Sequence, residues 1–124
     1  MNQTNIQPLL ASFKKEAQRL YQDRLAALYL FGSYARGDAG DDSDVDILVV
    51  LNDETISPFQ EIEAMGDFTF ELELAHEKPI QVIPTTKRQF NKLSSPLYYN
   101  VKREGASFMN GSIQILLEKA DTAL

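Results

Sequence analysis

Residues 30–50 read LFGSYARGDAGDDSDVDILVV, and this stretch decides the fold. An apolar run ends in Gly32-Ser33, and Asp44-Val45-Asp46 opens a second apolar run after an acidic loop. Because side chains alternate along a strand, two carboxylates two positions apart point to the same side of a sheet. Carboxylate oxygens suit a divalent metal ion, and a Gly-Ser turn before a helix suits phosphate. The stretch therefore predicts a site for a metal-bound nucleoside triphosphate.

The composition is typical of a globular protein without disulfides. The chain has 124 residues, of which 44% are hydrophobic and none is cysteine. We therefore expect a single domain over residues 1–124 with a core of its own. No apolar run approaches the roughly 20 residues that a membrane span needs, and the N-terminus lacks the pattern of a signal peptide. These features predict a cytoplasmic protein with no membrane partner.

The net charge of −6, from 18 acids and 12 bases, is concentrated in one loop. Five aspartates lie between residues 38 and 46, and without them the chain carries a charge of −1. Such a cluster repels itself and repels phosphate unless cations are bound within it. The pairs Lys87-Arg88 and Lys102-Arg103 are short and separate. We therefore expect no direct nucleic-acid binding, which needs concentrated basic residues.

Hydrophobic periodicity predicts an α/β domain with a small sheet flanked by helices. Helices are expected at residues 6–22, 34–37, 57–78, 86–93, 95–104 and 112–120, and strands at 26–31, 44–51 and 80–83. Ser33 is expected to cap the short second helix, and Gly37 to end it. The connection between the first two strands has about a dozen residues, a length that leaves their relative direction open.

The long helix that begins at Ser57 is expected to pack one apolar face against the sheet. Ser57 is the expected N-cap, with Pro58 in the first turn. The face is expected to consist of residues that recur at helical spacing, namely Phe59, Ile62, Met65, Thr69 and Leu72.

The carboxylates are the candidate metal ligands. Nucleotidyl transfer needs Mg²⁺ to bridge the phosphates and to neutralise the charge that builds in the transition state. Mg²⁺ is usually held by one or two carboxylates together with the phosphates of the substrate. Asp44 and Asp46 are predicted to supply these carboxylates and are the candidate catalytic residues.

Four further residues are candidates for nucleotide binding. Gly32 and Ser33, with the N–H groups of the following helix, are expected to hold the β- and γ-phosphates. Arg36 lies one helical turn later and can balance the triphosphate charge, although a surface pair with Asp38 or Asp42 is the alternative. Ser43 is a further candidate hydroxyl donor.

The motif also resembles that of a known superfamily. Gly32-Ser33, ten residues and Asp44-Val45-Asp46 resemble the signature of the DNA polymerase β-type nucleotidyltransferases, and the form GSYARGDAGDDSDVDILVV resembles their smallest branch, the minimal nucleotidyltransferases. The later stretch LSSPLYYNVKREGASF is similar to a segment of the same branch. The resemblance covers roughly residues 24–108 and implies a mixed sheet like that of the polymerase β palm.

This resemblance also implies partners and an activity. Members of the branch are often paired with a helical HEPN protein, usually an RNase toxin, for which the nucleotidyltransferase is the antitoxin. The resemblance implies transfer of AMP from ATP–Mg²⁺ to a hydroxyl of the toxin, that of a tyrosine, within a hetero-oligomer.

One position departs from the superfamily pattern. The resemblance implies a third catalytic carboxylate on the strand at 80–83, where this chain has Gln81. An amide cannot take a proton at neutral pH. Three interpretations remain open: a nearby acid (Glu71, Glu73 or Glu77) substitutes, two carboxylates suffice, or transfer is lost and only binding is retained.

Three functions are therefore compared. The first is an antitoxin that transfers AMP to its toxin. The second is a catalytically weakened antitoxin that neutralises the toxin by stoichiometric binding, as Gln81 suggests. The third is a nucleotidyltransferase for a small molecule such as an aminoglycoside, which ranks last because no additional acceptor-binding domain is expected.

Overall fold

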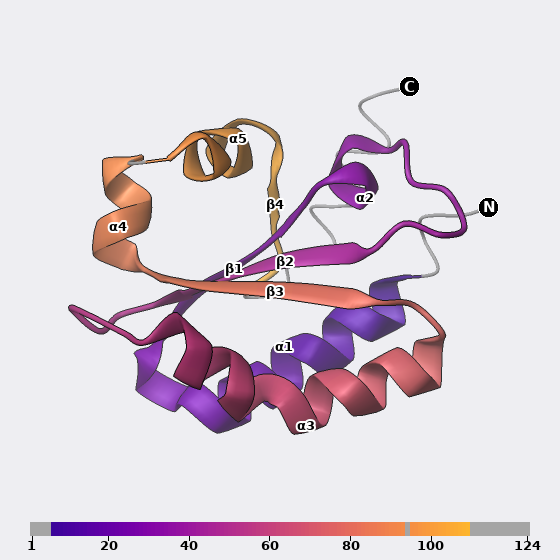
Figure 1. Cartoon of the computed structure of the whole chain (residues 1–124), viewed down its shortest axis with the longest axis horizontal. Coiled ribbons are helices and arrows are strands. Elements are labelled where there is room, and N and C mark those ends of the chain that lie inside the picture. Colours follow the sequence, from indigo (N-terminus) through magenta and orange to yellow (C-terminus); the bar gives the residue numbers. More distant parts are fainter. Residues whose placement is uncertain (1–5, 94, 110–124) are drawn as a thin grey trace.

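A four-stranded mixed sheet forms the centre of the protein, with helices on both faces (Figure 1). The computed structural model describes residues 6–93 and 95–109. The strands are β1 (Leu25–Phe31), β2 (Val45–Leu51), β3 (Ile80–Thr86) and β4 (Ala106–Ser107), in the order β3-β2-β1-β4. β1 runs antiparallel to both β2 and β4, whereas β2 and β3 are parallel. The predicted fold class is confirmed. The sequence left open the relative direction of β1 and β2, and the structure shows that they are antiparallel.

The helices divide between the two faces of the sheet. They are α1 (Gln7–Tyr21), the 3₁₀ turn η2 (Gln22–Arg24), α2 (Ser33–Arg36), α3 (Pro58–His76), α4 (Lys87–Lys92) and α5 (Pro96–Glu104). α1 and α3 lie together below the sheet in Figure 1, and α4 and α5 lie above it. None of the helices in the described part of the chain is both long and apolar enough to cross a membrane. The helix expected at residues 112–120 lies outside the described residues.

Strand β2 decides which face carries the acidic site. Its odd-numbered residues, from Val45 to Leu51, pack in the core with α1 and α3, whereas Leu48 and Val50 pack with α4 and α5. A central strand covered on both faces needs apolar residues throughout, which explains the near-continuous apolar run. Because side chains alternate, Asp46 shares the α4/α5 face with Leu48 and Val50.

Two segments differ from the predictions. β3 continues to Thr86, past Pro84, because an edge strand tolerates a proline that a central strand does not. β4 was not predicted, since two residues are too few to show a period. The face predicted for α3 is partly wrong: Met65 and Leu72 are buried, but Phe59 is 76% exposed and Ile62 is 42% exposed.

An ionic cluster ties α1, the β2–α3 loop and α3 together at the far end of the strands. Arg24 Nε donates to Asp53 Oδ1 at 2.9 Å, and Arg24 Nη2 donates to Glu61 Oε2 at 2.8 Å. The hydroxyl of Tyr21 donates to Glu61 Oε1 at 3.1 Å. Burial, followed by the charge of Glu61, raises the pKa of Tyr21, so its hydroxyl stays a proton donor.

Candidate functional site

The site is built on the close approach of Gly32 to Asp46. Antiparallel pairing sets Phe31 opposite Asp46, so the first residue after β1 lies against the second residue of β2. Gly32 has φ +78°, a conformation that glycine adopts without strain. A Cβ at this position would overlap with Oδ2 of Asp46. Both the backbone conformation and the neighbouring carboxylate therefore require glycine.

Gly32 also starts the short helix that follows it. Gly32 is the N-cap of α2, and its carbonyl accepts hydrogen bonds from the N–H groups of Ala35 at 3.1 Å and Arg36 at 3.0 Å. Ser33 is the first helical residue, so the prediction that Ser33 caps α2 is wrong. Gly37 ends the helix in the left-handed conformation, as predicted. Since the first N–H groups of a helix have no partner within it, this turn can present them to an anion.

Asp46 carries an oxygen without a partner. Its Oδ1 is buried and accepts no hydrogen bond from the described residues. Burial raises the pKa of Asp46, the nearby charge of Asp44 raises it further, and Arg36 lowers it. An ionised carboxylate is therefore unfavourable here until a cation approaches. Two neighbouring carboxylates with a free oxygen fit a hard divalent cation such as Mg²⁺.

Gln81 lies beside Asp46 on the neighbouring strand. The parallel register pairs Asp46 with Gln81, and by strand alternation both residues lie on the face of the sheet that carries α4 and α5. Among residues 6–93 and 95–109, no three His, Cys, Asp or Glu side chains are grouped to hold a metal ion. Glu73 is one of the three acids considered as substitutes for the third carboxylate. Its Oε2 accepts a hydrogen bond from the N–H of Ile80 at 2.8 Å, at the start of β3.

Arg36 and Ser43 have local partners in addition to their predicted roles. Arg36 Nε lies 3.4 Å from Asp38 Oδ2, and both side chains are exposed, so this pair contributes little to stability. The charge of Arg36 nevertheless lowers the pKa of Asp46, so Arg36 lies at the edge of the site. Ser43 Oγ accepts a hydrogen bond from the N–H of Gly40 at 2.9 Å, closing the acidic loop. Phosphate contact by either residue stays a prediction.

One contact near the site could not be found from local motifs. Lys78, between α3 and β3, places its ammonium group 5.8 Å from the centre of the Tyr34 ring in α2. Tyr34 is itself buried in the core with α1 and α3. The two residues are far apart in sequence, and together they hold α2 against the rest of the domain.

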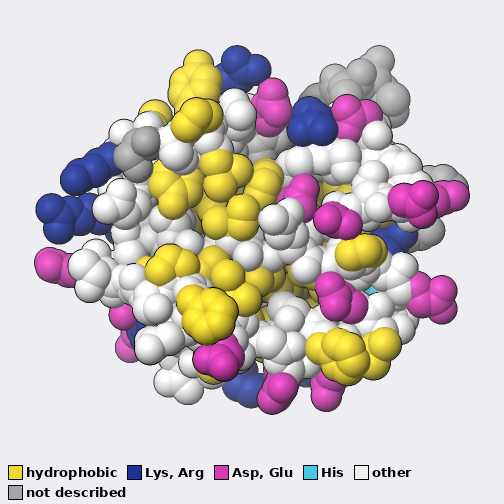
Figure 2. Space-filling view, viewed as in Figure 1, with side chains coloured by type: hydrophobic (Ala, Val, Ile, Leu, Met, Phe, Trp, Pro, Cys, Tyr) yellow, Lys and Arg dark blue, Asp and Glu magenta, His cyan; other side chains and the backbone are white. Residues whose placement is uncertain are grey.

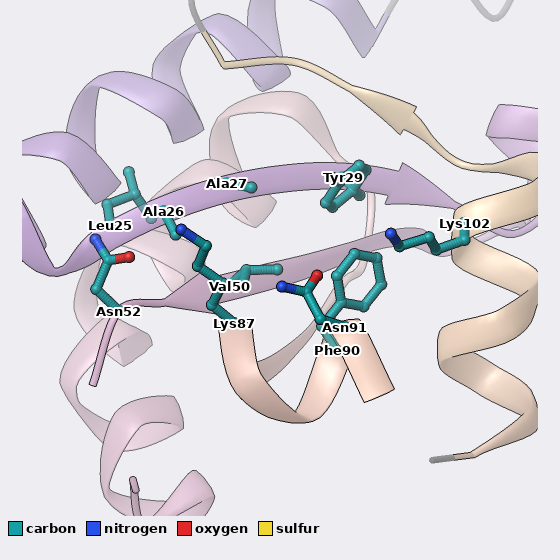
Figure 3. Close-up of a pocket in the computed structure, with 10 residues that line it drawn as sticks. All are labelled: Leu25, Ala26, Ala27, Tyr29, Val50, Asn52, Lys87, Phe90, Asn91 and Lys102. Atoms are coloured by element: carbon teal, nitrogen blue, oxygen red, sulfur yellow. The ribbon is translucent and has the colours of Figure 1, made fainter. Parts of the chain in front are cut away.

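A separate cavity lies at the other end of β1. It has a volume of about 390 Å³, with an apolar floor that includes Ala27 and Val50 (Figure 3). Lys87 and Lys102 line it from α4 and α5, and the Lys102 ammonium group lies 5.5 Å from the centre of the Phe90 ring. The cavity includes none of the predicted site residues.

The chain as a whole also matches known proteins. The sequence profile described as the nucleotidyltransferase domain matches residues 10–104. The chain belongs to the nucleotidyltransferase domain family. This nucleotidyltransferase is 30% identical, over 102 residues, to a proposed protein adenylyltransferase of Methanocaldococcus jannaschii, a match that covers 82% of this chain and 95% of that protein. A second proposed adenylyltransferase of that organism is 42% identical over 45 residues, and the match spans only 46% of its length.

Solved structures share the fold of this nucleotidyltransferase. A proposed nucleotidyltransferase of Sulfolobus solfataricus aligns with a TM-score of 0.57 and 20% identity, covering 87% of each chain. A chain from a toxin–antitoxin structure with AMP-PNP aligns with a TM-score of 0.54 and 20% identity, covering 99% of this chain and 87% of that one. At these identities the likeness establishes the fold.

We predict that Asp46→Asn stabilises the ligand-free protein. The folded pKa of Asp46 lies above the unfolded value, so the folded state binds more protons and stability falls as pH rises through that window. Asparagine removes the charge. The Tm of the variant, measured by calorimetry without divalent ions, should exceed that of wild type at neutral pH, and the difference should shrink as pH falls towards the ordinary aspartate range. A lower Tm at neutral pH would contradict this.

We also predict that Gly32→Ala disrupts the site. The added Cβ displaces the Asp46 carboxylate and strains a residue at positive φ, at a cost of about 1–3 kcal/mol. Denaturant unfolding and binding of Mg²⁺ with a nucleotide analogue measure the two effects. Gly40→Ala is the matched control, because a Cβ there meets open space and its φ is not positive. Equal effects of the two substitutions would refute the close-approach argument.

Proposed function

We propose that this protein is an antitoxin that transfers AMP from ATP–Mg²⁺ to a hydroxyl group, that of a tyrosine, on a cognate HEPN RNase toxin. The observation that carries the proposal is the close approach of Gly32 to the Asp46 carboxylate, with Asp44 two residues away, in a member of the nucleotidyltransferase family. A relative named as a proposed protein adenylyltransferase, matched over 95% of its length, supports the reaction type. Structural neighbours described as toxin–antitoxin structures support a toxin as the partner. The proposed location is the cytoplasm.

The residues of this chain have distinct tasks in the proposed reaction. Asp44 and Asp46 would hold Mg²⁺, which supplies charge neutralisation at the phosphates when it is bound. Ser33 and the first N–H groups of α2 bind the β- and γ-phosphates, and Arg36 balances their charge. These contacts orient the triphosphate so that its α-phosphate faces the acceptor.

The transfer forms one bond and breaks one. The acceptor hydroxyl oxygen forms a bond to the α-phosphorus, while the bond from that phosphorus to the bridging oxygen breaks and pyrophosphate leaves. The hydroxyl proton must pass to a base, and Gln81 cannot accept it. In this proposal the proton passes to solvent or to a group of the acceptor protein, and the rate is correspondingly low because a general base contributes roughly 10²–10⁴-fold.

Labelling of the toxin tests the proposal. With ATP labelled at the α-phosphate, Mg²⁺ and the cognate toxin, we expect label on the toxin from wild type and none from the double variant Asp44→Ala, Asp46→Ala. The matched control is Asp41→Ala, Asp42→Ala, which removes two exposed acids of the same loop and should retain labelling. An unlabelled toxin with wild type, or equal label with the Asp44/Asp46 variant, would count against AMP transfer.

Stoichiometric neutralisation is the second candidate, and Gln81 is the observation that favours it. In that case the Asp44/Asp46 double variant should still protect cells from the toxin. The variant Gln81→Asp, which adds a carboxylate beside Asp46, tests whether the missing base limits the rate of AMP transfer. If wild type transfers AMP slowly for want of a base, this variant should label the toxin faster, and an unchanged rate would remove the lack of a base as the reason for slow transfer.

A further inference from the structure

Helix α3 exposes an apolar stripe that the fold does not use. Phe59 is 76% exposed, Phe70 59% and Leu74 64%, and Ile62 is 42% exposed. With Gly66, these residues recur at spacings of three and four and therefore share one side of the helix. We call this set, Phe59, Ile62, Gly66, Phe70 and Leu74, the α3 stripe. Figure 2 shows hydrophobic side chains exposed among acidic ones in the region of α3, below β3.

The opposite side of α3 already packs in the core. Met65 and Leu72 are buried there, and Phe68 packs edge-on against Phe13 with ring centres 5.2 Å apart. α3 is thus apolar on two sides, whereas a surface helix ordinarily has one apolar side and one polar side. A helix that is apolar on both sides is expected to be covered on both, so the α3 stripe marks a binding surface.

Gly66 is a second, independent observation. A glycine inside a helix lowers its stability relative to alanine, and such a residue usually has a packing reason. Here a Cβ at Gly66 would meet nothing within 4 Å, so the described fold gives no reason for glycine. Close packing of another protein against Gly66 would explain the glycine. We call this gap in the side chains, midway along the stripe, the Gly66 notch.

Charge identifies the kind of protein that covers the stripe. α3 contains five acids and no lysine or arginine. Glu61 is paired with Arg24 and Glu73 with the N–H of Ile80, whereas Glu63, Asp67 and Glu71 are exposed along one flank of the stripe. Asp67 and Glu71 also line the adjoining groove of about 440 Å³ between α1 and α3, where Glu16 is paired with Arg19 at 3.5 Å. An occupant with basic residues beside its apolar face complements this surface.

A second copy of the chain fits the surface poorly. In a two-fold pairing of antiparallel α3 helices, each flank meets the same flank of the other copy. The row of Glu63, Asp67 and Glu71 would then face its own copy, and like charges at an interface are unfavourable. The observations therefore favour a different protein.

We propose that the α3 stripe is the docking surface for an amphipathic helix of the partner protein, with lysine or arginine residues flanking an apolar face that seats on Gly66. This inference rests on the proposed function, in which that partner is the cognate toxin. α3 lies on the face of the sheet opposite Asp46 and Gln81. A toxin held on α3 therefore leaves the nucleotide site open while it is bound.

Matched charge insertions test the docking surface. Ile62 and Leu93 are aliphatic residues of similar exposure, 42% and 39%, but Leu93 lies at the end of α4, on the other face of the sheet. Affinity of each variant for the purified cognate toxin is measured by isothermal titration calorimetry, with Tm as a check on folding. We expect Ile62→Glu to weaken binding about 30-fold or more, as for a buried interface residue, and Leu93→Glu to change it less than about threefold.

Gly66→Ala separates an interface role from a structural one. We expect it to raise the Tm of the free protein, because alanine favours the helix, yet to weaken toxin binding about tenfold because the Cβ fills the notch. Charge reversal by Glu63→Lys with Glu71→Lys should also weaken binding, and the loss should shrink at high salt.

The outcomes distinguish the two proposals. If wild type does not bind the toxin, the antitoxin function itself fails, and this docking surface fails with it. If wild type binds and Ile62→Glu binds equally well, only the docking surface is overturned. A wild-type protein that sediments alone as a dimer, and that Ile62→Glu converts to a monomer, would assign the stripe to a second copy and contradict the proposal.

Discussion

The close approach of Gly32 to the Asp46 carboxylate is the constraint on which the site depends. Antiparallel pairing of β1 and β2 brings the end of one strand against the beginning of the other. Only a residue without a Cβ, at positive φ, leaves room for the carboxylate there. The same glycine starts α2, so one position fixes both the Asp46 carboxylate, which we propose as a metal ligand, and the helix turn that we propose binds the phosphates. The motif is therefore one geometric unit.

Electrostatics explain why this unit should bind a cation. Asp46 has a buried oxygen that accepts no hydrogen bond from residues 6–93 or 95–109, and its pKa is raised by burial and by Asp44. Without a cation, the ionised form of Asp46 is disfavoured by burial and by repulsion from Asp44. Binding of a divalent ion would offset both effects. Gln81 lies next to this carboxylate but adds no charge and no base. The arrangement therefore favours nucleotide and metal binding more strongly than rapid proton transfer.

The sequence predicts the site motif better than it predicts the surfaces. The β2 pattern and the Gly37 terminus are local features, and the structure has both as predicted. The strand direction, the pairing of Gln81 with Asp46 and the contact of Lys78 with Tyr34 depend on residues far apart in the chain. Phe59 and Ile62 misled the prediction for α3 because periodicity marks an apolar side without saying whether the protein itself covers it.

Titration of the Asp46 carboxyl by ¹³C NMR tests the central claim most directly. We expect a pKa above the ordinary aspartate range without divalent ions, and a clear fall when Mg²⁺ and α,β-methylene-ATP, which cannot donate AMP, are added. Ser33→Ala should weaken nucleotide binding but leave the metal-free pKa of Asp46 raised. An ordinary or low pKa without metal, or a raised pKa that Mg²⁺ and nucleotide leave unchanged, would contradict the account.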